Sequence, residues 1–282
     1  MDFYSTLIKS EELFAHLSDP DWVVIDCRFD LFQPEWGLEN YRLGSIPGAV
    51  YADVEKDLSG PKTGDTGRHP LPDPESFLTT MGSMGVSNQS QVVVYDTSSG
   101  SFAARLWWLL IYYGHPRVAV LDGGYTAWVQ AGFPIMTGDQ RRSPAHFTGF
   151  PNEEMVISSS EMLTLHSHEG YRVMDARSPE RFRGEIELID PIAGRIPNSL
   201  NRFHQDNLDQ AGKLKEPEIL LREFKLLLGD APPENVIVYC GSGVTACHHL
   251  LALASAGVQG VKLYAGSWSE WILDPNRPLA KG

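Results

Sequence analysis

Residues 236–251 read VIVYCGSGVTACHHLL, and this stretch decides the fold. The run at residues 236–240 predicts a buried strand, and residues 245–256 predict a helix. Residues 241–244, which include two glycines, form the turn between them. Cys240 is therefore expected at the carboxyl end of a parallel strand, where open α/β sheets place their reactive groups.

The short turn predicts a reactive cysteine. Gly241 and Gly243 let the loop curl so that successive backbone N–H groups face one point, and the following helix adds the positive end of its dipole. This potential is expected to favour the thiolate of Cys240, a nucleophile that can carry a persulfide. The alternative is that Cys240 only packs in the core, as free cysteines often do. That role is expected for Cys27, inside a predicted strand, and for Cys247, in the helix.

The sequence repeats itself. Residues 24–28 (VIDCR) resemble residues 173–177 (VMDAR), and residues 92–96 (VVVYD) resemble residues 236–240 (VIVYC). Asp96 therefore stands in the first copy where the second copy has its cysteine. In both halves, short β-branched runs alternate with helical patterns. Each copy is thus predicted to be an α/β domain, a parallel sheet flanked by helices.

The chain has 282 residues, which is long enough for two domains. We predict an N-terminal domain at residues 1–138, a linker at residues 139–155 and a C-terminal domain at residues 156–282. The first copy has an extra loop around residues 60–69. Because a carboxylate cannot accept sulfane sulfur as a thiolate can, the first copy, with Asp96, is predicted to be inactive.

Composition excludes several kinds of partner. The net charge is -13, from 36 acidic and 23 basic side chains, and no stripe of Lys or Arg stands out, so neither nucleic acid nor a membrane is an expected partner. Residues 1–20 contain no unbroken apolar stretch, so no secretory signal or membrane span is expected there. Three cysteines form no disulfide framework, which favours a reducing, cytoplasmic location.

The loop at residues 240–246 (CGSGVTA) resembles the active-site loop of 3-mercaptopyruvate sulfurtransferases, within the family of tandem rhodaneses. The similarity extends to residues 175–182 (DARSPERF), 266–271 (GSWSEW) and 121–125 (LDGGY), and covers essentially the whole chain. It implies an enzyme without cofactor or metal that moves sulfur from a small-molecule donor through a Cys240 persulfide. The implied acceptor is cyanide or a thiol, either a small thiol or a thioredoxin-like protein.

The loop itself bears on the choice of donor. The resemblance implies that its residues contact the substrate, namely Gly241, Ser242, Gly243, Val244 and Thr245. Thiosulfate sulfurtransferases usually carry cationic side chains after the cysteine, which suit a dianion, whereas this loop continues with glycine and serine. Charge therefore favours 3-mercaptopyruvate. Thiosulfate as the main donor, with cyanide as acceptor, is the alternative.

Arg181 falls where the family has an arginine that holds the substrate carboxylate, a role that suits the guanidinium fork. The alternative is that Arg181 pairs with a neighbouring acid on the surface. The mercaptopyruvate enzymes carry a second arginine a few residues later, but residues 187–192 (ELIDPI) contain none. This departure leaves the preferred donor open. Arg195 is one candidate to replace the missing cation.

Ser242, His69 and Glu55 occupy the positions of a serine–histidine–acid relay that the resemblance implies. Neutral His69 would accept the Ser242 proton and Glu55 would orient the ring. His69 lies in the extra loop of the first copy, so the loop would reach the other domain. The alternatives are that His69 is a surface residue and that Glu55, among other acids, belongs to a solvated turn.

The sequence argues against a phosphatase and against a metal site. Cysteine phosphatases need an arginine six positions after the cysteine, where this chain has Ala246. His248 and His249 follow Cys247 on the helix, but neighbouring helical residues point in different directions and no second ligand pair is present, so no metal site is predicted. A persulfide carrier or redox sensor of low turnover remains as a non-enzymatic alternative.

Overall fold

The computed structural model describes residues 3–97 and 99–282, which form two compact units. The first unit comprises the chain up to Gly60, Pro72–Asn152 and Gln210–Lys213, and the second comprises Pro61–Leu71, Glu153–Asp209 and Leu214–Gly282. The segment Pro61–Leu71 thus belongs to the second unit, although it is inserted in the sequence of the first. Each unit is a parallel sheet flanked by helices, which confirms the predicted α/β class.

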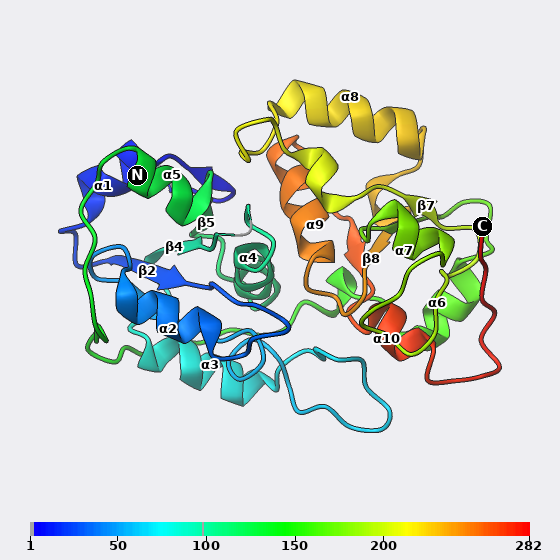
Figure 1. Cartoon of the computed structure of the whole chain (residues 1–282), viewed down its shortest axis with the longest axis horizontal. Helices are drawn as coiled ribbons and strands as arrows, with labels where there is room; N and C mark the ends of the chain where they lie inside the picture. Colours follow the sequence, from blue (N-terminus) through cyan, green and yellow to red (C-terminus); the bar gives the residue numbers. More distant parts are fainter. Residues whose placement is uncertain (1–2, 98) are drawn as a thin grey trace. The chain divides into compact units, whose positions relative to one another are not determined.

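The first unit contains a five-stranded parallel sheet in the order β1-β5-β4-β2-β3 (Figure 1). Its strands are β1 (Leu7–Ile8), β2 (Trp22–Asp26), β3 (Val50–Tyr51), β4 (Gln91–Tyr95) and β5 (Val118–Leu121). Its helices are α1 (Ser10–His16), α2 (Trp36–Leu43), α3 (Pro74–Ser83), α4 (Ala103–Tyr112) and α5 (Gly124–Gln130). All five residues of the central strand β4 are buried, as expected for a parallel strand covered on both faces.

The core of the first unit shows which helices cover one face of its sheet. Leu13 of α1, Tyr41 of α2 and Trp128 of α5 are buried in one hydrophobic cluster with alternate residues of the strands, such as Val93 and Tyr95. Because side chains two apart in a strand share a face, these three helices cover the same side of the sheet.

The second unit repeats this topology with a four-stranded parallel sheet in the order β7-β6-β8-β9. Its strands are β6 (Arg172–Asp175), β7 (Leu200–Asn201), β8 (Val236–Tyr239) and β9 (Lys262–Leu263). Its α-helices are α6 (Ser159–Leu165), α7 (Pro179–Arg183), α8 (Pro217–Leu228), α9 (Ala246–Ser255) and α10 (Ser267–Trp271), and its 3₁₀ helices are η1 (Glu153–Met155), η2 (His204–Asn207) and η3 (Pro233–Asn235). A parallel bridge from Val156 to Leu263 takes the place of β1.

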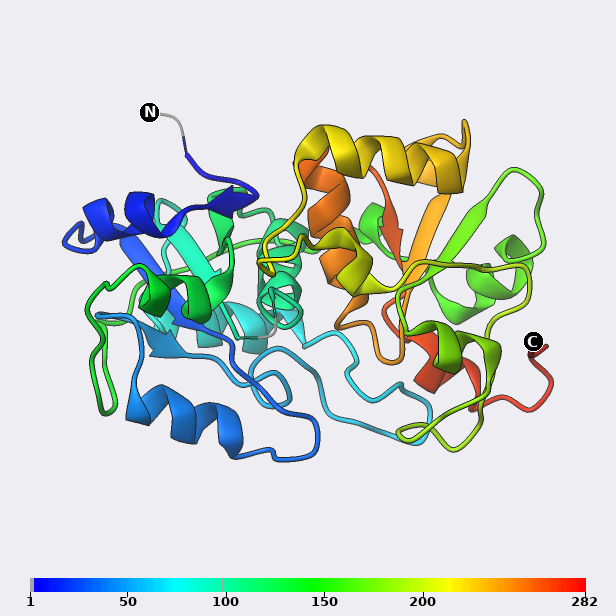
Figure 2. The ribbon, with the colours of Figure 1, turned by 45° about the horizontal axis from the view of Figure 1, so that its top comes forward.

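Figures 1 and 2 show α8 and α9 together on one side of the second sheet. On the other side, Met162 of α6 and Trp268 and Trp271 of α10 share a buried cluster with Ile237 and Tyr239 of β8. The last strand residue before the predicted loop is therefore fixed from both faces of the sheet. This packing sets the position at which Cys240 leaves the sheet.

Both units contain the same buried ion pair, which confirms the internal repeat at the level of side chains. Arg28 binds Asp26 in the first unit and Arg177 binds Asp175 in the second, each through the guanidinium Nε and Nη2 atoms. Each arginine also donates to the carbonyl of the glycine two residues before an Ile-Pro pair. A buried pair with these additional hydrogen bonds keeps both charges satisfied inside the domain.

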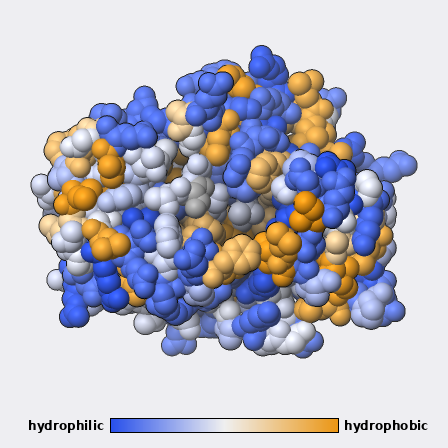
Figure 3. Space-filling view, viewed as in Figure 1, coloured by the Kyte–Doolittle hydropathy of each residue, from blue (hydrophilic) through white to orange (hydrophobic). Residues whose placement is uncertain are grey.

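Figure 3 shows that hydrophilic residues cover most of the visible surface, with apolar residues in separate groups. This surface agrees with the acidic composition. Across residues 3–97 and 99–282, every helix is too short or too polar to cross a lipid bilayer.

Candidate active site

Cys240 begins the loop that joins β8 to α9, at the carboxyl end of the strand. Its backbone is fixed on both sides, because its N–H donates to Ser267 Oγ at 3.1 Å and its carbonyl accepts from the Trp268 N–H at 3.0 Å. The side chain is 1% exposed. The Gly243 N–H donates to the Cys240 sulfur, with 3.2 Å between nitrogen and Sγ. The sulfur is thus buried beside a backbone donor and not only among apolar groups.

The rest of the loop supplies donors that the protein does not use. The backbone N–H groups of Gly241, Ser242, Val244, Thr245 and Ala246 have no acceptor among the residues that the structure describes. Helix α9 begins at the last of these residues, so its unpaired amino-terminal donors also lie here. Together with the Gly243 N–H, these groups can hold an anion at the Cys240 sulfur.

The corresponding loop of the first unit shows such donors binding an anion. The Asp96 carboxylate accepts from the Gly100 N–H at 2.8 Å and from the Phe102 and Ala103 N–H groups at 2.7 and 2.9 Å. Asp96 is fully buried. The loop after β4 therefore satisfies its own backbone donors with an aspartate, at the position where the loop after β8 has a cysteine.

Ser242 and His69 form a hydrogen bond of 2.7 Å between Ser242 Oγ and His69 Nδ1. Both side chains are buried, which makes His69 an interior group of the second unit and not a surface residue. His69 is carried by the segment Pro61–Leu71. The structure thus brings together two of the three residues predicted for the relay.

Glu55 lies in the first unit, in a turn of acidic residues. Its N–H donates to the Asp53 carboxylate at 2.9 Å, and the Lys56 N–H donates to the same oxygen at 3.1 Å. The Glu55 side chain is exposed. The predicted role of Glu55 in orienting His69 stays a prediction.

Arg181 of α7 is held by two buried acids. Its Nε and Nη2 atoms donate to Glu187 at 2.9 to 3.2 Å, and Nη2 also donates to Asp190 Oδ2 at 3.0 Å. Pairing with acids was the alternative to substrate binding. The two are compatible here, because the Arg181 guanidinium also lies beside the active loop: a Cβ added to Gly241 would be 3.4 Å from its Nη2 atom.

Arg68 is the cation that sequence analysis missed. It precedes His69 and donates to Asp190 Oδ1, and its Nη2 atom would lie 2.8 Å from a Cβ placed on Gly241. Burial lowers the pKa of the Arg68 guanidinium, and the nearby charge of Cys240 opposes this shift. Arg195, the candidate replacement, instead lies over the Phe182 ring and donates to the Gly282 carbonyl. An arginine directly before the predicted histidine was the signal available in the sequence.

The remaining predicted core residues lie where they were expected. Cys27 and Cys247 are fully buried, and burial raises the pKa of the Cys27 thiol well above its usual range. Among the described residues, no group of three or more His, Cys, Asp or Glu side chains could hold a metal ion. His248 and His249 both contact the Asn207 side-chain amide through Nδ1.

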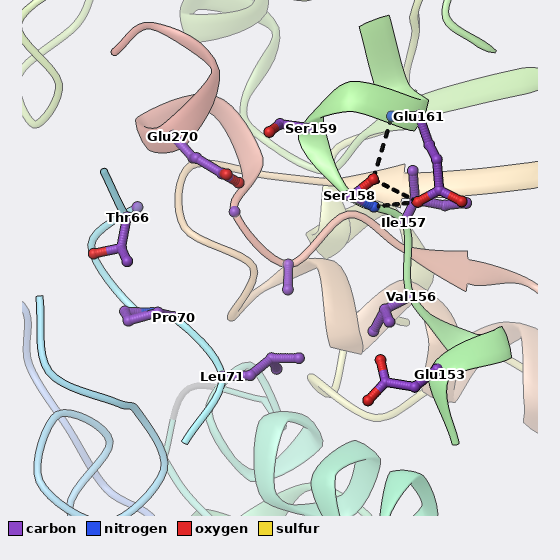
Figure 4. Close-up of a pocket in the computed structure, with 13 residues that line it drawn as sticks. Thr66, Pro70, Leu71, Glu153, Val156, Ile157, Ser158, Ser159, Glu161 and Glu270 are labelled. Atoms are coloured by element: carbon purple, nitrogen blue, oxygen red, sulfur yellow. Dashed lines mark hydrogen bonds between the residues drawn. The ribbon is translucent and has the colours of Figure 1, made fainter. Parts of the chain in front are cut away.

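A pocket of about 480 Å³ lies in the second unit (Figure 4). Thr66, Pro70 and Leu71 line one side of it, and Ile157 and Glu270 contribute to the rest. Within the segment Pro61–Leu71, Thr66, Pro70 and Leu71 line the pocket, whereas Arg68 and His69 lie against the loop after β8.

Comparison with known proteins agrees with this architecture. The family model "Rhodanese-like domain" matches residues 9–131 and 158–274, one match in each half of the chain. The chain therefore belongs to the rhodanese family and is a sulfurtransferase with two rhodanese-like domains.

Several relatives cover nearly the whole chain. The "Probable 3-mercaptopyruvate sulfurtransferase" of Pseudomonas aeruginosa is 46% identical over 98% of both chains. The "Putative thiosulfate sulfurtransferase" of Mycobacterium tuberculosis is 37% identical over 98% of this chain and 97% of its own. The crystal structure of an Escherichia coli 3-mercaptopyruvate sulfotransferase is 33% identical, with a TM-score of 0.82 over 95% of this chain and all of the other. The relatives thus carry the names of both donors considered above.

Proposed function

We propose that the chain transfers sulfane sulfur from 3-mercaptopyruvate to cyanide or a thiol through a persulfide on Cys240. The observation that carries the proposal is the Cys240 sulfur at 3.2 Å from the Gly243 N–H, in a loop with five further backbone donors that have no acceptor within residues 3–97 and 99–282. These donors favour an anion at this position, first the thiolate and then the persulfide. Burial of the sulfur would shield the persulfide from water.

In the first half of the reaction, the Cys240 thiolate attacks the donor sulfur. The sulfur–sulfur bond forms as the carbon–sulfur bond breaks, and the electron pair leaves with pyruvate as its enolate. Ser242, hydrogen-bonded to His69, is placed to pass a proton to the enolate carbon. The donor thiol loses its own proton as its sulfur becomes the outer sulfur of the persulfide, and the imidazole relays that proton to the Ser242 oxygen. Glu55 is proposed to orient the imidazole, and Arg181 to bind the donor carboxylate.

In the second half, an acceptor attacks the outer sulfur of the persulfide. A thiolate acceptor, from a small thiol or a thioredoxin-like protein, forms a new persulfide, and cyanide forms thiocyanate. In both cases the electron pair of the sulfur–sulfur bond returns to Cys240 as the thiolate. Because donor and acceptor react in separate steps, ping-pong kinetics are expected.

The first unit is proposed to be non-catalytic, since Asp96 occupies the place of the nucleophile and its carboxylate accepts hydrogen bonds from the backbone N–H groups of its loop. We also propose a cytoplasmic setting, because all three cysteines are free thiols and a reducing compartment keeps them so.

Replacement of the nucleophile tests the assignment directly. Cys240→Ser should abolish pyruvate release from 3-mercaptopyruvate and thiocyanate formation from thiosulfate, because serine cannot carry sulfane sulfur. Mass spectrometry after exposure to donor alone should show one added sulfur atom on wild type and none on the variant. Cys247→Ser, at a buried thiol in α9, is the matched control and should retain the added sulfur. Substantial transfer by Cys240→Ser would contradict the mechanism.

Comparison of kcat/KM for the two donors then tests the substrate. A higher value for 3-mercaptopyruvate is expected. A higher value for thiosulfate would favour the alternative, and turnover with neither donor would favour a persulfide carrier.

A further inference from the structure

Ser267 has an unusual backbone conformation for a residue with a side chain. Its φ is 55°, in the left-handed region where the backbone crowds a Cβ atom, and the residue is fully buried. Residues 266–271 correspond in the repeat to residues 123–128, so the first unit has Gly124 at this position, with φ of 57°. Both units thus place a left-handed residue here. The first unit uses glycine, which adopts this conformation without strain, and the second uses serine, which does not.

The Ser267 hydroxyl group takes the place of a hydrogen bond of the sheet. Val238 of β8 pairs with Leu263 of β9, and the Tyr264 N–H donates to the Val238 carbonyl at 2.9 Å. In a parallel ladder, the next bond would run from the Cys240 N–H to the Tyr264 carbonyl. Instead, the Cys240 N–H donates to Ser267 Oγ at 3.1 Å, and the Ser267 hydroxyl donates to the Tyr264 carbonyl at 2.9 Å. The hydroxyl is therefore inserted between two backbone groups that would otherwise bond directly.

This insertion sets the point at which the chain leaves the sheet. A hydroxyl group between the two backbones holds the Cys240 peptide away from β9, whereas a direct bond would continue the strand. The carbonyl of the same residue is held alike in both units, because the Trp268 N–H donates to Cys240 at 3.0 Å and the Tyr125 N–H donates to Asp96 at 2.9 Å. Glycine at the position of Ser267 has no hydroxyl, so this position supplies the bridge only in the unit that has the cysteine.

The Cys240 peptide in turn controls the sulfur. Sγ lies 3.2 Å from the Gly243 N–H, in the loop that begins at this peptide. Because hydrogen bonds weaken steeply with distance and angle, a small rotation of the peptide would move the sulfur away from this donor. Both hydrogen bonds of the Ser267 hydroxyl are made to backbone atoms. The serine therefore acts on the sulfur through the Cys240 peptide.

We propose that Ser267 is a positioning residue for the nucleophile, and that its left-handed conformation is kept because it presents the hydroxyl group to the Cys240 N–H. A left-handed serine costs free energy that glycine would not, and such strain persists where the surrounding contacts hold it in place. The inference rests on the proposed function and deepens it, because it names the residue that sets the direction of the attacking sulfur.

The test begins with Ser267→Gly in the full-length protein. Glycine folds at the corresponding position of the first unit with nearly the same φ, so the variant is expected to fold. kcat/KM should fall about tenfold or more, and by the same factor for 3-mercaptopyruvate and for thiosulfate, because misplacement of a reacting atom slows attack on either donor. The ultraviolet absorbance of the Cys240 thiolate near neutral pH, measured against the same protein with Cys240→Ser, should also fall, because the sulfur loses its backbone donor.

Ser267→Ala separates the hydroxyl group from the backbone strain, since alanine keeps the Cβ in the left-handed conformation but lacks the hydroxyl. It should show the same fall in kcat/KM and in thiolate absorbance as Ser267→Gly, with a lower midpoint of urea unfolding. Wild-type kcat/KM in the alanine variant would assign the effect of glycine to backbone freedom and overturn the inference.

Asn198→Gly is the matched control. Asn198 is an exposed residue of the same unit with φ of 62°, and the repeat places Gly48, with φ of 79°, at its position in the first unit. This variant should keep both wild-type values. Unchanged kcat/KM and thiolate absorbance in Ser267→Gly, or a loss for one donor alone, would refute the role of Ser267. If the wild-type protein turns over neither donor, the proposed function fails, while the thiolate absorbance still decides whether Ser267 positions the sulfur.

Discussion

The two glycines of the cysteine loop serve different purposes. Gly243 adopts a left-handed conformation with φ of 78°, and a Cβ on it would be 2.2 Å from the Ala265 carbonyl oxygen. Gly241 instead makes room for the Arg68 guanidinium. The first glycine therefore leaves room for a neighbouring side chain, whereas the second is required by the backbone itself.

This difference makes the glycines separable by mutation. Gly241→Ala should leave the free energy of unfolding nearly unchanged, because the new methyl group meets only the ends of flexible arginine side chains. It should raise KM for 3-mercaptopyruvate, because one of these side chains is Arg181, which is proposed to bind the donor carboxylate. Gly243→Ala should lower the free energy of unfolding by at least about 2 kcal/mol, through strain and a backbone clash. Urea unfolding and donor kinetics on both variants check the pair. A destabilised Gly241→Ala protein with unaltered KM would contradict the assignment.

At the same residue scale, the sequence led to the nucleophile and to Ser242, His69 and Arg181 near it, but not to Arg68. Cys240, between a strand and two glycines, is identifiable because local pattern alone places it at the sheet edge. The position of Arg68 cannot be identified in this way, because its partner Asp190 is far away in the sequence and no local pattern links the two residues. Its place follows only from tertiary contacts.

Among the elements, the loop between β4 and α4 corresponds to the loop between β8 and α9. The first loop begins with an aspartate and the second with a cysteine. Helix α9 spans Ala246–Ser255, close to the predicted residues 245–256, since Thr245 precedes it in the turn and the apolar pattern ends near its last residue. The sequence predicted that Asp96 replaces the cysteine, but not that its carboxylate binds the backbone of its own loop. The direction of backbone N–H groups depends on loop geometry, which the sequence pattern does not give.

Removal of this internal anion should destabilise the first unit. Asp96→Ala leaves the N–H groups of Gly100, Phe102 and Ala103 without their acceptor, at a cost of about 3 kcal/mol in the free energy of unfolding. Asp96→Asn keeps an acceptor oxygen and should cost less. Urea unfolding followed by circular dichroism measures both. If Asp96→Ala is as stable as wild type, the aspartate does not hold its loop.

At the scale of the whole molecule, buried histidines couple stability to pH. His249 lies in the core of the second unit, with Nδ1 at 2.8 Å from the Asn207 amide nitrogen and Nε2 at 2.8 Å from the Arg202 carbonyl. Burial, together with the neighbouring His248, lowers the pKa of His249 well below its usual range. The folded protein therefore holds this imidazole neutral while the unfolded chain binds a proton below about pH 6.5.

Stability from this residue is complete above the ordinary histidine pKa and is lost as pH falls through it. We expect the free energy of unfolding to drop by about 2 kcal/mol between pH 7 and pH 5 on account of His249. His249→Gln should flatten this part of the curve, whereas His168→Gln, at an exposed position, should not. Urea titrations at pH 5, 6 and 7 measure the free energy of unfolding. If it falls with pH equally in wild type and His249→Gln, His249 is not the cause of the fall.

The two-domain organisation could be predicted from the repeat, since each copy carries the same strand motifs and the same buried aspartate–arginine pair. The placement of Pro61–Leu71 with the second unit was expected only from the resemblance, which pairs His69 with Ser242. Composition alone does not indicate it, because the insertion is polar and resembles an ordinary surface loop. Only its packing shows what it supports.

The segment Pro61–Leu71 means that the second half of the chain cannot form its complete site alone. A fragment cut out at residues 139–155 would possess the nucleophile but lack both Arg68 and His69, which are encoded upstream. The second copy of the repeat thus depends on the first, because the copy without a cysteine at this position still contributes side chains to the copy that has one. Loss of the first half would remove the hydrogen-bond partner of Ser242 as surely as loss of the cysteine would remove the proposed nucleophile.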